Sequence, residues 1–120
     1  MEKSVFVKSN DAVLYLVSGK KDALNLPQLD STASEGAGEK HLPVVTCSGK
    51  NITVKVGSVA HPMSEEHSID WIFLETKKGG QFVKLSPQEE PVAHFVLPEQ
   101  DEACAAYAYC NLHGFWKTEL

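Results

Sequence analysis

The stretch LPVVTCSGKNITVKVGSVA, residues 42–60, decides the fold class, because it holds two short apolar runs separated by the polar turn SGKN. Runs rich in Val, Ile and Thr and bounded by turn residues favour strands. Four further runs follow at intervals of about ten residues: SIDWIFLE, QFVKL, VAHFVL and AAYAY. Regular short strands broken by turn signals such as KKGG and SPQEEP are typical of a β-sandwich or barrel. The sequence therefore predicts an all-β protein.

Two stretches near the C-terminus are harder to interpret. The alanines of DEACAAYAYC, residues 101–110, favour helix by propensity, although Tyr107 and Tyr109 alternate as they would in a strand. We predict a strand there. The next stretch, CNLHGFWK at residues 110–117, has the composition of a loop.

The N-terminal part has its own pattern. The runs SVFVKS and AVLYLVSG flank an Asn-Asp turn at Asn10 and Asp11, which predicts a β-hairpin. Residues 20–38 are polar and rich in Gly, Ser, Pro and Ala, with no helical periodicity, and this composition predicts a connector.

Composition limits the range of functions. The chain has 120 residues, 42% of them hydrophobic, and a net charge of -5, which disfavours a general role on nucleic acid or on a membrane surface. The first residues contain no apolar signal segment, and no run approaches the roughly 18 apolar residues that a membrane span requires. We therefore expect a cytoplasmic protein, whose three cysteines are reduced thiols.

The candidate ligands for a metal are histidines in turn-like contexts, together with one cysteine. Imidazole is the commonest metal ligand in proteins, and a thiolate can complete such a set. A closed tetrahedral zinc site holds four ligands, so five are one too many, whereas a nitrogen-rich set with an open position suits iron. The candidates are His41, His61, His67, Cys110 and His113.

Three strings, EKHLPVV, VKVGSVAHPMSEEHSIDWI and YCNLHGFWK, carry a resemblance to a known family. Over roughly residues 36–120 the chain resembles superoxide reductase, the iron domain of the desulfoferrodoxin and neelaredoxin group. The resemblance implies an immunoglobulin-like β-sandwich, with the iron domain at residues 39–120. Residues 1–38 resemble a desulforedoxin-like module without its cysteines, so a small N-terminal β module without a second iron is expected.

The same resemblance implies roles for individual residues. Four equatorial histidines, His41, His61, His67 and His113, and the axial thiolate of Cys110 would hold one mononuclear non-haem iron. Glu39 would occupy the sixth position of the oxidised iron, and Lys40 would guide superoxide and help to organise protonation. The implied reaction is the one-electron reduction of superoxide to hydrogen peroxide. A rubredoxin-like donor would then re-reduce the iron, in a homo-oligomer that is a dimer or a tetramer.

Three rival functions stay open at the level of sequence. A blue-copper (cupredoxin-like) electron carrier also uses a β-sandwich, but its site needs two histidines and usually a methionine shortly after the cysteine, which CNLHGFWK lacks. The second rival is a non-catalytic immunoglobulin-like module, and the third is a superoxide dismutase. We expect no functional role for His94, Cys47 or Cys104, and we expect Trp71 and Trp116 to lie in the core or in the wall of the site.

Overall fold

The structure, a computed structural model, describes residues 5–20, 25–28 and 38–120. The chain divides into two compact units, residues 1–30 and 31–120. The predicted boundary after residue 38 lies beside residues 29–37, which are outside the described part, so it stays a prediction. Most of the predicted connector also lies outside the described residues.

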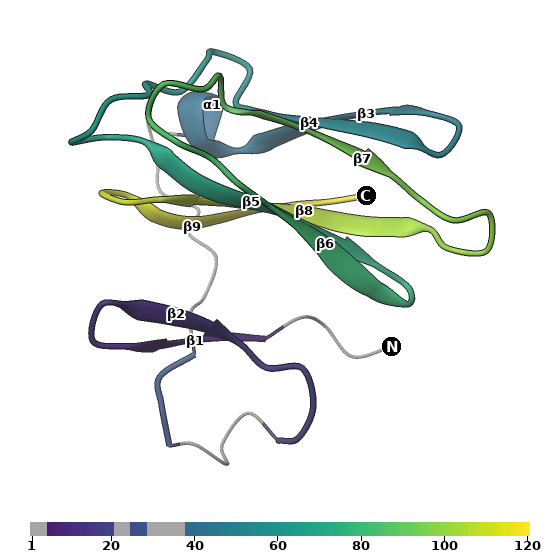
Figure 1. Cartoon of the computed structure of the whole chain (residues 1–120), viewed down its shortest axis with the longest axis horizontal. Coiled ribbons are helices and arrows are strands. Elements are labelled where there is room, and N and C mark those ends of the chain that lie inside the picture. Colours follow the sequence, from purple (N-terminus) through teal and green to yellow (C-terminus); the bar gives the residue numbers. More distant parts are fainter. Residues whose placement is uncertain (1–4, 21–24, 29–37) are drawn as a thin grey trace. The chain divides into compact units, whose positions relative to one another are not determined.

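The larger unit is a sandwich of two antiparallel sheets, one of three strands and one of four (Figure 1). The all-β prediction and the immunoglobulin-like sandwich are therefore confirmed. A single helical turn, α1 (Gly38–His41), precedes the first sandwich strand. The three-stranded sheet has the order β3 (Pro43–Ser48), β4 (Asn51–Val56), β7 (Val92–Val96), and the four-stranded sheet has the order β6 (Gly79–Lys84), β5 (Ile69–Thr76), β8 (Ala103–Cys110), β9 (Gly114–Glu119).

The ambiguous alanine-rich stretch is a strand, as predicted, and it pairs with β5 on one side and β9 on the other. The interpretation of CNLHGFWK as a loop was wrong from Gly114 onwards, because β9 begins there and pairs back on β8. Gly114 has a φ of 81°, a conformation that glycine adopts freely, and this lets the chain reverse within a short turn.

The core lies between the inner faces of the two sheets. Alternation places every second residue of β4, and of β8 from Ala106 to Cys110, inside, where each is almost inaccessible to solvent. Ala106 and Ala108 of β8 are therefore core residues, in one cluster with the larger Val and Ile residues of β4 on the opposite sheet. Cys110 is the last of these inward residues and is fully buried. The core cluster includes Ile52, Val54, Val56, Ile69, Ile72, Leu74, Phe95, Ala106, Ala108 and Cys110.

The outer face of the four-stranded sheet is aromatic. The rings of Trp71 and Tyr109 are parallel, with centroids 5.6 Å apart, and the ring of Phe73 packs on Phe82 at 4.3 Å. The Phe73 ring occupies the space beside the backbone of Gly80, so a Cβ added there would overlap it. Trp71 thus packs on the outside of the sheet and not in the inner core.

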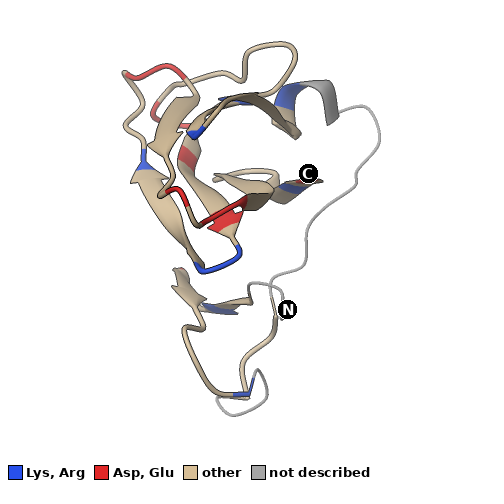
Figure 2. Cartoon of the chain, turned by 90° about the vertical axis from the view of Figure 1, so that its right-hand side faces the viewer, with Lys and Arg blue, Asp and Glu red and all other residues tan. Residues whose placement is uncertain are grey.

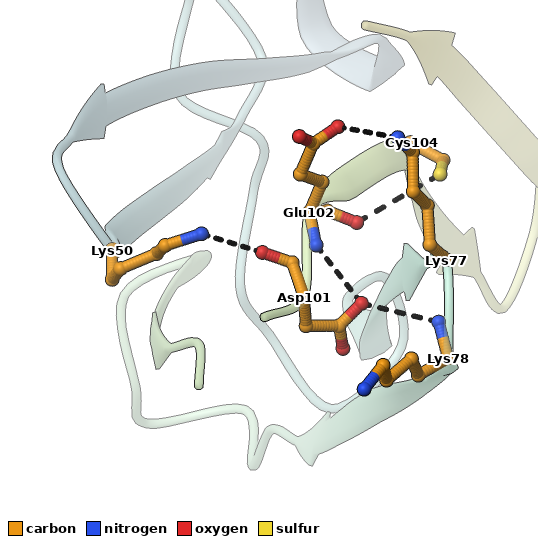
Figure 3. A network of polar contacts seen from close by, with 6 residues as sticks. All are labelled: Lys50, Lys77, Lys78, Asp101, Glu102 and Cys104. Atoms are coloured by element: carbon orange, nitrogen blue, oxygen red, sulfur yellow. Dashed lines mark hydrogen bonds and ion pairs between the residues drawn. The ribbon is translucent and has the colours of Figure 1, made fainter. Parts of the chain in front are cut away.

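At the end of the sandwich away from Cys110, polar contacts join the β3–β4 turn, the β5–β6 turn and the segment before β8 (Figure 3). Lys50 donates from Nζ to the carbonyl oxygen of Asp101 at 2.6 Å, and the Asp101 carboxylate accepts from the backbone N–H groups of Lys78 and Glu102. A hydrogen bond from the Thr76 side chain is the main cause that lowers the pKa of Asp101, and the two backbone N–H groups add to the effect. Elsewhere on the sandwich, basic and acidic residues are interspersed along the strands and turns (Figure 2).

The smaller unit contains the predicted hairpin, made of β1 (Phe6–Ser9) and β2 (Ala12–Tyr15). Asn10 takes the left-handed conformation that such a turn needs, with a φ of 52°. In the part of the chain that the structure describes, no helix is long and apolar enough to cross a membrane.

Candidate metal centre

Connections at one end of the sandwich carry all of the predicted metal ligands. His41 is the last residue of α1, and Leu42 alone separates it from β3. His61 and His67 lie in the connection from β4 to β5, Cys110 ends β8, and His113 lies in the turn from β8 to β9. Antiparallel pairing brings these connections to the same end, since Ile69 at the start of β5 lies opposite Cys110.

The four imidazole rings form a square. Neighbouring centroids are 4.6 Å apart for His41 and His61, 4.6 Å for His61 and His67, 5.0 Å for His67 and His113, and 4.9 Å for His113 and His41. Each ring meets its neighbour edge to face, with interplanar angles of 71°, 79°, 75° and 83°. His41 and His67 lie across the diagonal at 6.4 Å. The arrangement is a four-bladed pinwheel around a common centre.

The donor atoms of these side chains point to that centre. The Nε2 atoms of His41 and His61 are 3.0 Å apart, and one donor atom from each of His41, His61, His67 and Cys110 lies within 4.8 Å of the others. Nδ1 of His113 lies 3.8 Å from Sγ of Cys110, so this fifth residue adjoins the group. Two neighbouring nitrogens in a square around one ion, each about 2.1 Å from it, would be about 3.0 Å apart, as the Nε2 atoms of His41 and His61 are. The observed separations therefore fit a single ion.

The protonation state of His61 suits a ligand. Its Nδ1 lies 2.7 Å from the carbonyl oxygen of Pro62, which can only accept, so Nδ1 carries the proton and Nε2 keeps its lone pair. Burial lowers the pKa of His61 to about 4, and the charges of the other three rings of the pinwheel add to the effect. His61 is therefore neutral at pH 7.

The side chain of His67 gives independent support for a metal site. Its Nε2 is buried and has no hydrogen-bond partner. A buried polar atom without a partner is costly, and a bound cation would satisfy it. Desolvation lowers the pKa of His67, followed by the charges of His113 and Lys40, and this favours the neutral ring that a metal requires.

Cys110 lies on the core side of the pinwheel. It is fully buried, and the backbone N–H of His113 donates to its Sγ at 3.4 Å. A donor of this kind stabilises a thiolate, which is the form of cysteine that binds metals. With four imidazoles and one sulfur, the donor set is one that iron accepts.

The two residues before His41 are placed less completely. Lys40 is exposed, and its charge contributes to the lowered pKa of His67, so it lies close enough to act on the site electrostatically. The backbone of Glu39 belongs to α1, whereas its side chain lies outside the described part of the structure. The role predicted for Glu39 stays a prediction.

The histidine and cysteines for which no functional role is expected lie outside the pinwheel. His94 is on β7, where Nδ1 lies 3.2 Å from Oγ1 of Thr53. Cys47 is exposed and Cys104 is half-buried, and neither belongs to the ligand group.

Two further residues border the ligands. The ring of Trp116 stacks on that of His41, so Trp116 forms part of the wall, as expected. Asn111 joins two of the ligand loops through its side-chain amide. The sequence patterns gave no role to Asn111, although it stands inside the CNLHG string.

A β-sandwich whose loops gather four imidazoles and one buried thiol defines the class of mononuclear non-haem metalloproteins, with iron as the suitable ion. The family model described as Desulfoferrodoxin matches residues 33–119. The chain belongs to the desulfoferrodoxin family. Membership does not favour a blue-copper carrier or a non-catalytic immunoglobulin-like module.

Several known proteins are similar to this chain. A protein named desulfoferrodoxin from Clostridium acetobutylicum is 37% identical over 98% of this chain and 96% of its own length. A protein named superoxide reductase from Pyrococcus horikoshii is 35% identical over 69% of this chain and 87% of its own length. Among solved structures, the superoxide reductase from Treponema pallidum has a TM-score of 0.75 at 38% identity, covering 95% of this chain and 84% of that one.

Proposed function

We infer that this protein is a superoxide reductase that uses one mononuclear non-haem iron. In the reaction, superoxide takes up one electron and two protons and becomes hydrogen peroxide. Proteins named superoxide reductase are similar to the chain in sequence and in structure. The single observation that carries the inference is the pinwheel of four imidazoles beside the buried Cys110 sulfur.

We propose that His41, His61, His67, His113 and Cys110 would hold the iron, with the four rings of the pinwheel and the sulfur on its core side as the donors. Bound iron supplies the electron and the position where superoxide binds, as it alternates between Fe²⁺ and Fe³⁺. Four neutral rings and one thiolate leave Fe²⁺ with a formal charge of +1, which favours an anionic substrate. Because Cys110 is buried, the side of the histidine plane away from it would be the one that superoxide reaches.

Residues near the plane would assist the substrate. We propose that Lys40 attracts superoxide and helps to organise its protonation, since its charge acts on His67 in a protein that is acidic overall. Glu39 would occupy the sixth position of the oxidised iron. Replacing Glu39 by Ala should then change the spectrum of the oxidised protein and leave the reduced protein unaltered.

We also propose the wider setting of the reaction. An external rubredoxin-like protein would return the electron, the chain would form a dimer or tetramer, and it would work in the cytoplasm. Residues 1–38 contain no cysteine, so the N-terminal module would contribute no second iron. Light scattering of the purified protein tests the oligomeric state, and reduction assays with candidate donors test the source of the electron.

The first test is the metal content and visible spectrum of the purified protein in both oxidation states. About one iron per chain is expected, with a thiolate-to-iron charge-transfer band on oxidation. The band should vanish in Cys110→Ala and persist in Cys47→Ala, which removes an exposed cysteine outside the ligand group. Zinc, copper or no metal would contradict the proposed site.

The second test separates reductase from dismutase. A reductase forms peroxide from each superoxide and needs a donor, whereas a dismutase also forms oxygen and needs none. We expect superoxide generated in a pulse to yield peroxide with little oxygen when a donor is present. Continued turnover without a donor, with oxygen released, would assign the protein as a dismutase.

A further inference from the structure

We propose that Asn111 is a positioning residue that holds the His67 loop and the Cys110 loop together around the metal. It follows Cys110 directly in the sequence, yet its hydrogen bonds reach the two residues that flank His67. The inference rests on the proposed iron site and adds to it a residue that does not itself bind the ion.

The Asn111 contacts use the backbone and both ends of the side-chain amide. Oδ1 accepts from the backbone N–H of Ser68 at 3.0 Å, and Nδ2 donates to the carbonyl oxygen of Glu66 at 2.9 Å. The backbone N–H of Asn111 also donates to the carbonyl oxygen of Ser68 at 3.1 Å. Three hydrogen bonds therefore join one residue to the segment 66–68.

The segment that Asn111 contacts is itself closed on His67. The N–H of Ser64 donates to the carbonyl oxygen of His67 at 2.9 Å, and the His67 N–H donates to Oγ of Ser64 at 3.2 Å. The backbone of His67 is thus fixed within its own turn. The Asn111 side chain then fixes that turn against the end of β8, where Cys110 begins the next loop.

Asparagine suits this task because its planar amide carries a donor and an acceptor side by side. Aspartate keeps an acceptor for the Ser68 N–H but opposes the Glu66 carbonyl with a second acceptor. Alanine keeps only the backbone contact. Replacing Asn111 by Asp therefore removes one side-chain hydrogen bond, and replacing it by Ala removes both.

Loss of the Asn111 side chain is expected to change the affinity for the metal more than the stability of the fold. The unpartnered Nε2 of His67 and the Cys110 sulfur belong to one ligand group, although His67 lies in the connection from β4 to β5 and Cys110 ends β8. Partners outside the ligand set that orient the ligands typically change metal affinity about 10- to 100-fold when they are removed. Asn111 is expected to belong to this group of residues.

The experiment compares Asn111→Ala and Asn111→Asp with Gln81→Ala in the full chain loaded with iron. Gln81 is a matched control, because its side-chain amide donates to the carbonyl oxygen of Val96 at 3.0 Å and β6 carries no ligand. The measurements are the rate at which Fe²⁺ passes to a chelator, the position of the charge-transfer band, and the melting temperature of the metal-free protein.

In Asn111→Ala we expect iron release about 10- to 100-fold faster than in the wild type and a shifted band. The rate of iron release from Asn111→Asp should lie between those of the wild type and Asn111→Ala. Gln81→Ala should release iron at the wild-type rate even if its melting temperature falls. Wild-type release and an unchanged band in Asn111→Ala would overturn the proposal. Equal acceleration in Gln81→Ala would also overturn it, because the effect would then reflect general stability.

Two further outcomes are covered by the same design. If Asn111→Ala does not fold, Asn111→Asp carries the test, and wild-type iron release in that variant overturns the proposal. If the wild type holds iron but does not reduce superoxide, the proposed function fails while iron release still tests Asn111. The two failures are therefore distinguishable.

Discussion

The indole ring of Trp116 stacks on the imidazole of His41, with ring centroids 4.6 Å apart and planes 18° from parallel. The same indole donates from Nε1 to the carbonyl oxygen of His113 at 3.1 Å. Trp116 is fully buried in β9, so one rigid side chain supports two of the proposed ligands. The sequence pattern did not predict strand β9, yet β9 is the element that positions Trp116 beside the ligands.

We expect Trp116→Phe to lower the free energy of unfolding by about 1–3 kcal/mol, because the ring becomes smaller and the hydrogen bond to His113 is lost. Iron should also be released faster, since the His113 backbone loses its support. Denaturant unfolding and chelator transfer measure the two effects. Trp71→Phe is the control, because Trp71 packs on the outer face with Tyr109 and should leave iron release unchanged.

Replacing Lys40 by Ala should slow the reaction with superoxide about tenfold and remove most of its dependence on ionic strength. The reason is that an exposed positive charge beside the ligands raises the local concentration of an anion. Pulse-generated superoxide, followed across a salt series, measures both quantities. Lys78→Ala removes a charge from the turn at the other end of β5 and should react as the wild type does. An unchanged rate in Lys40→Ala would refute steering by this residue.

The stability of the metal-free protein should rise with pH between about 4 and 6.5. In this window the unfolded chain protonates His61 near its ordinary pKa of 6.5, whereas in the folded chain burial lowers the pKa to about 4. The unfolded state then binds more protons, so the free energy of unfolding increases with pH. His61→Gln cannot titrate and should flatten the dependence. An equally steep dependence in that variant would assign it to other groups.

Gly80→Ala should destabilise the protein by about 1–3 kcal/mol, through overpacking. A Cβ at this position would overlap the Phe73 ring and approach the carbonyl oxygen of Leu74 to 2.8 Å. The cost should shrink when Phe73 is first replaced by Leu, which a double-mutant cycle of urea unfolding would measure. An equal cost in both backgrounds would show that the ring is not what excludes a side chain.

Most of the fold could be predicted because strands leave a local signal. Alternation marked β4, β7 and β8, and the Asn10 turn marked the hairpin. The prediction missed β9 for a physical reason. Its first residues directly follow the turn that carries His113, and its sequence is too short to show a strand pattern, so only pairing with β8 makes it a strand. The sequence placed Trp116 in the core or the wall of the site, but only this pairing sets its ring against His41 and its N–H against the His113 carbonyl oxygen.

The sequence by itself determined the all-β class, the types of ligand and the strings that mark the family, because each of these is recorded in neighbouring residues. Only the tertiary structure decided that His41 and His113 meet in one square and that Nε2 of His61 faces inward. It also decided that Asn111 joins the loops of His67 and Cys110. These relationships depend on contacts between residues far apart in the chain, which form only when the two sheets pack and bring their loops to one end.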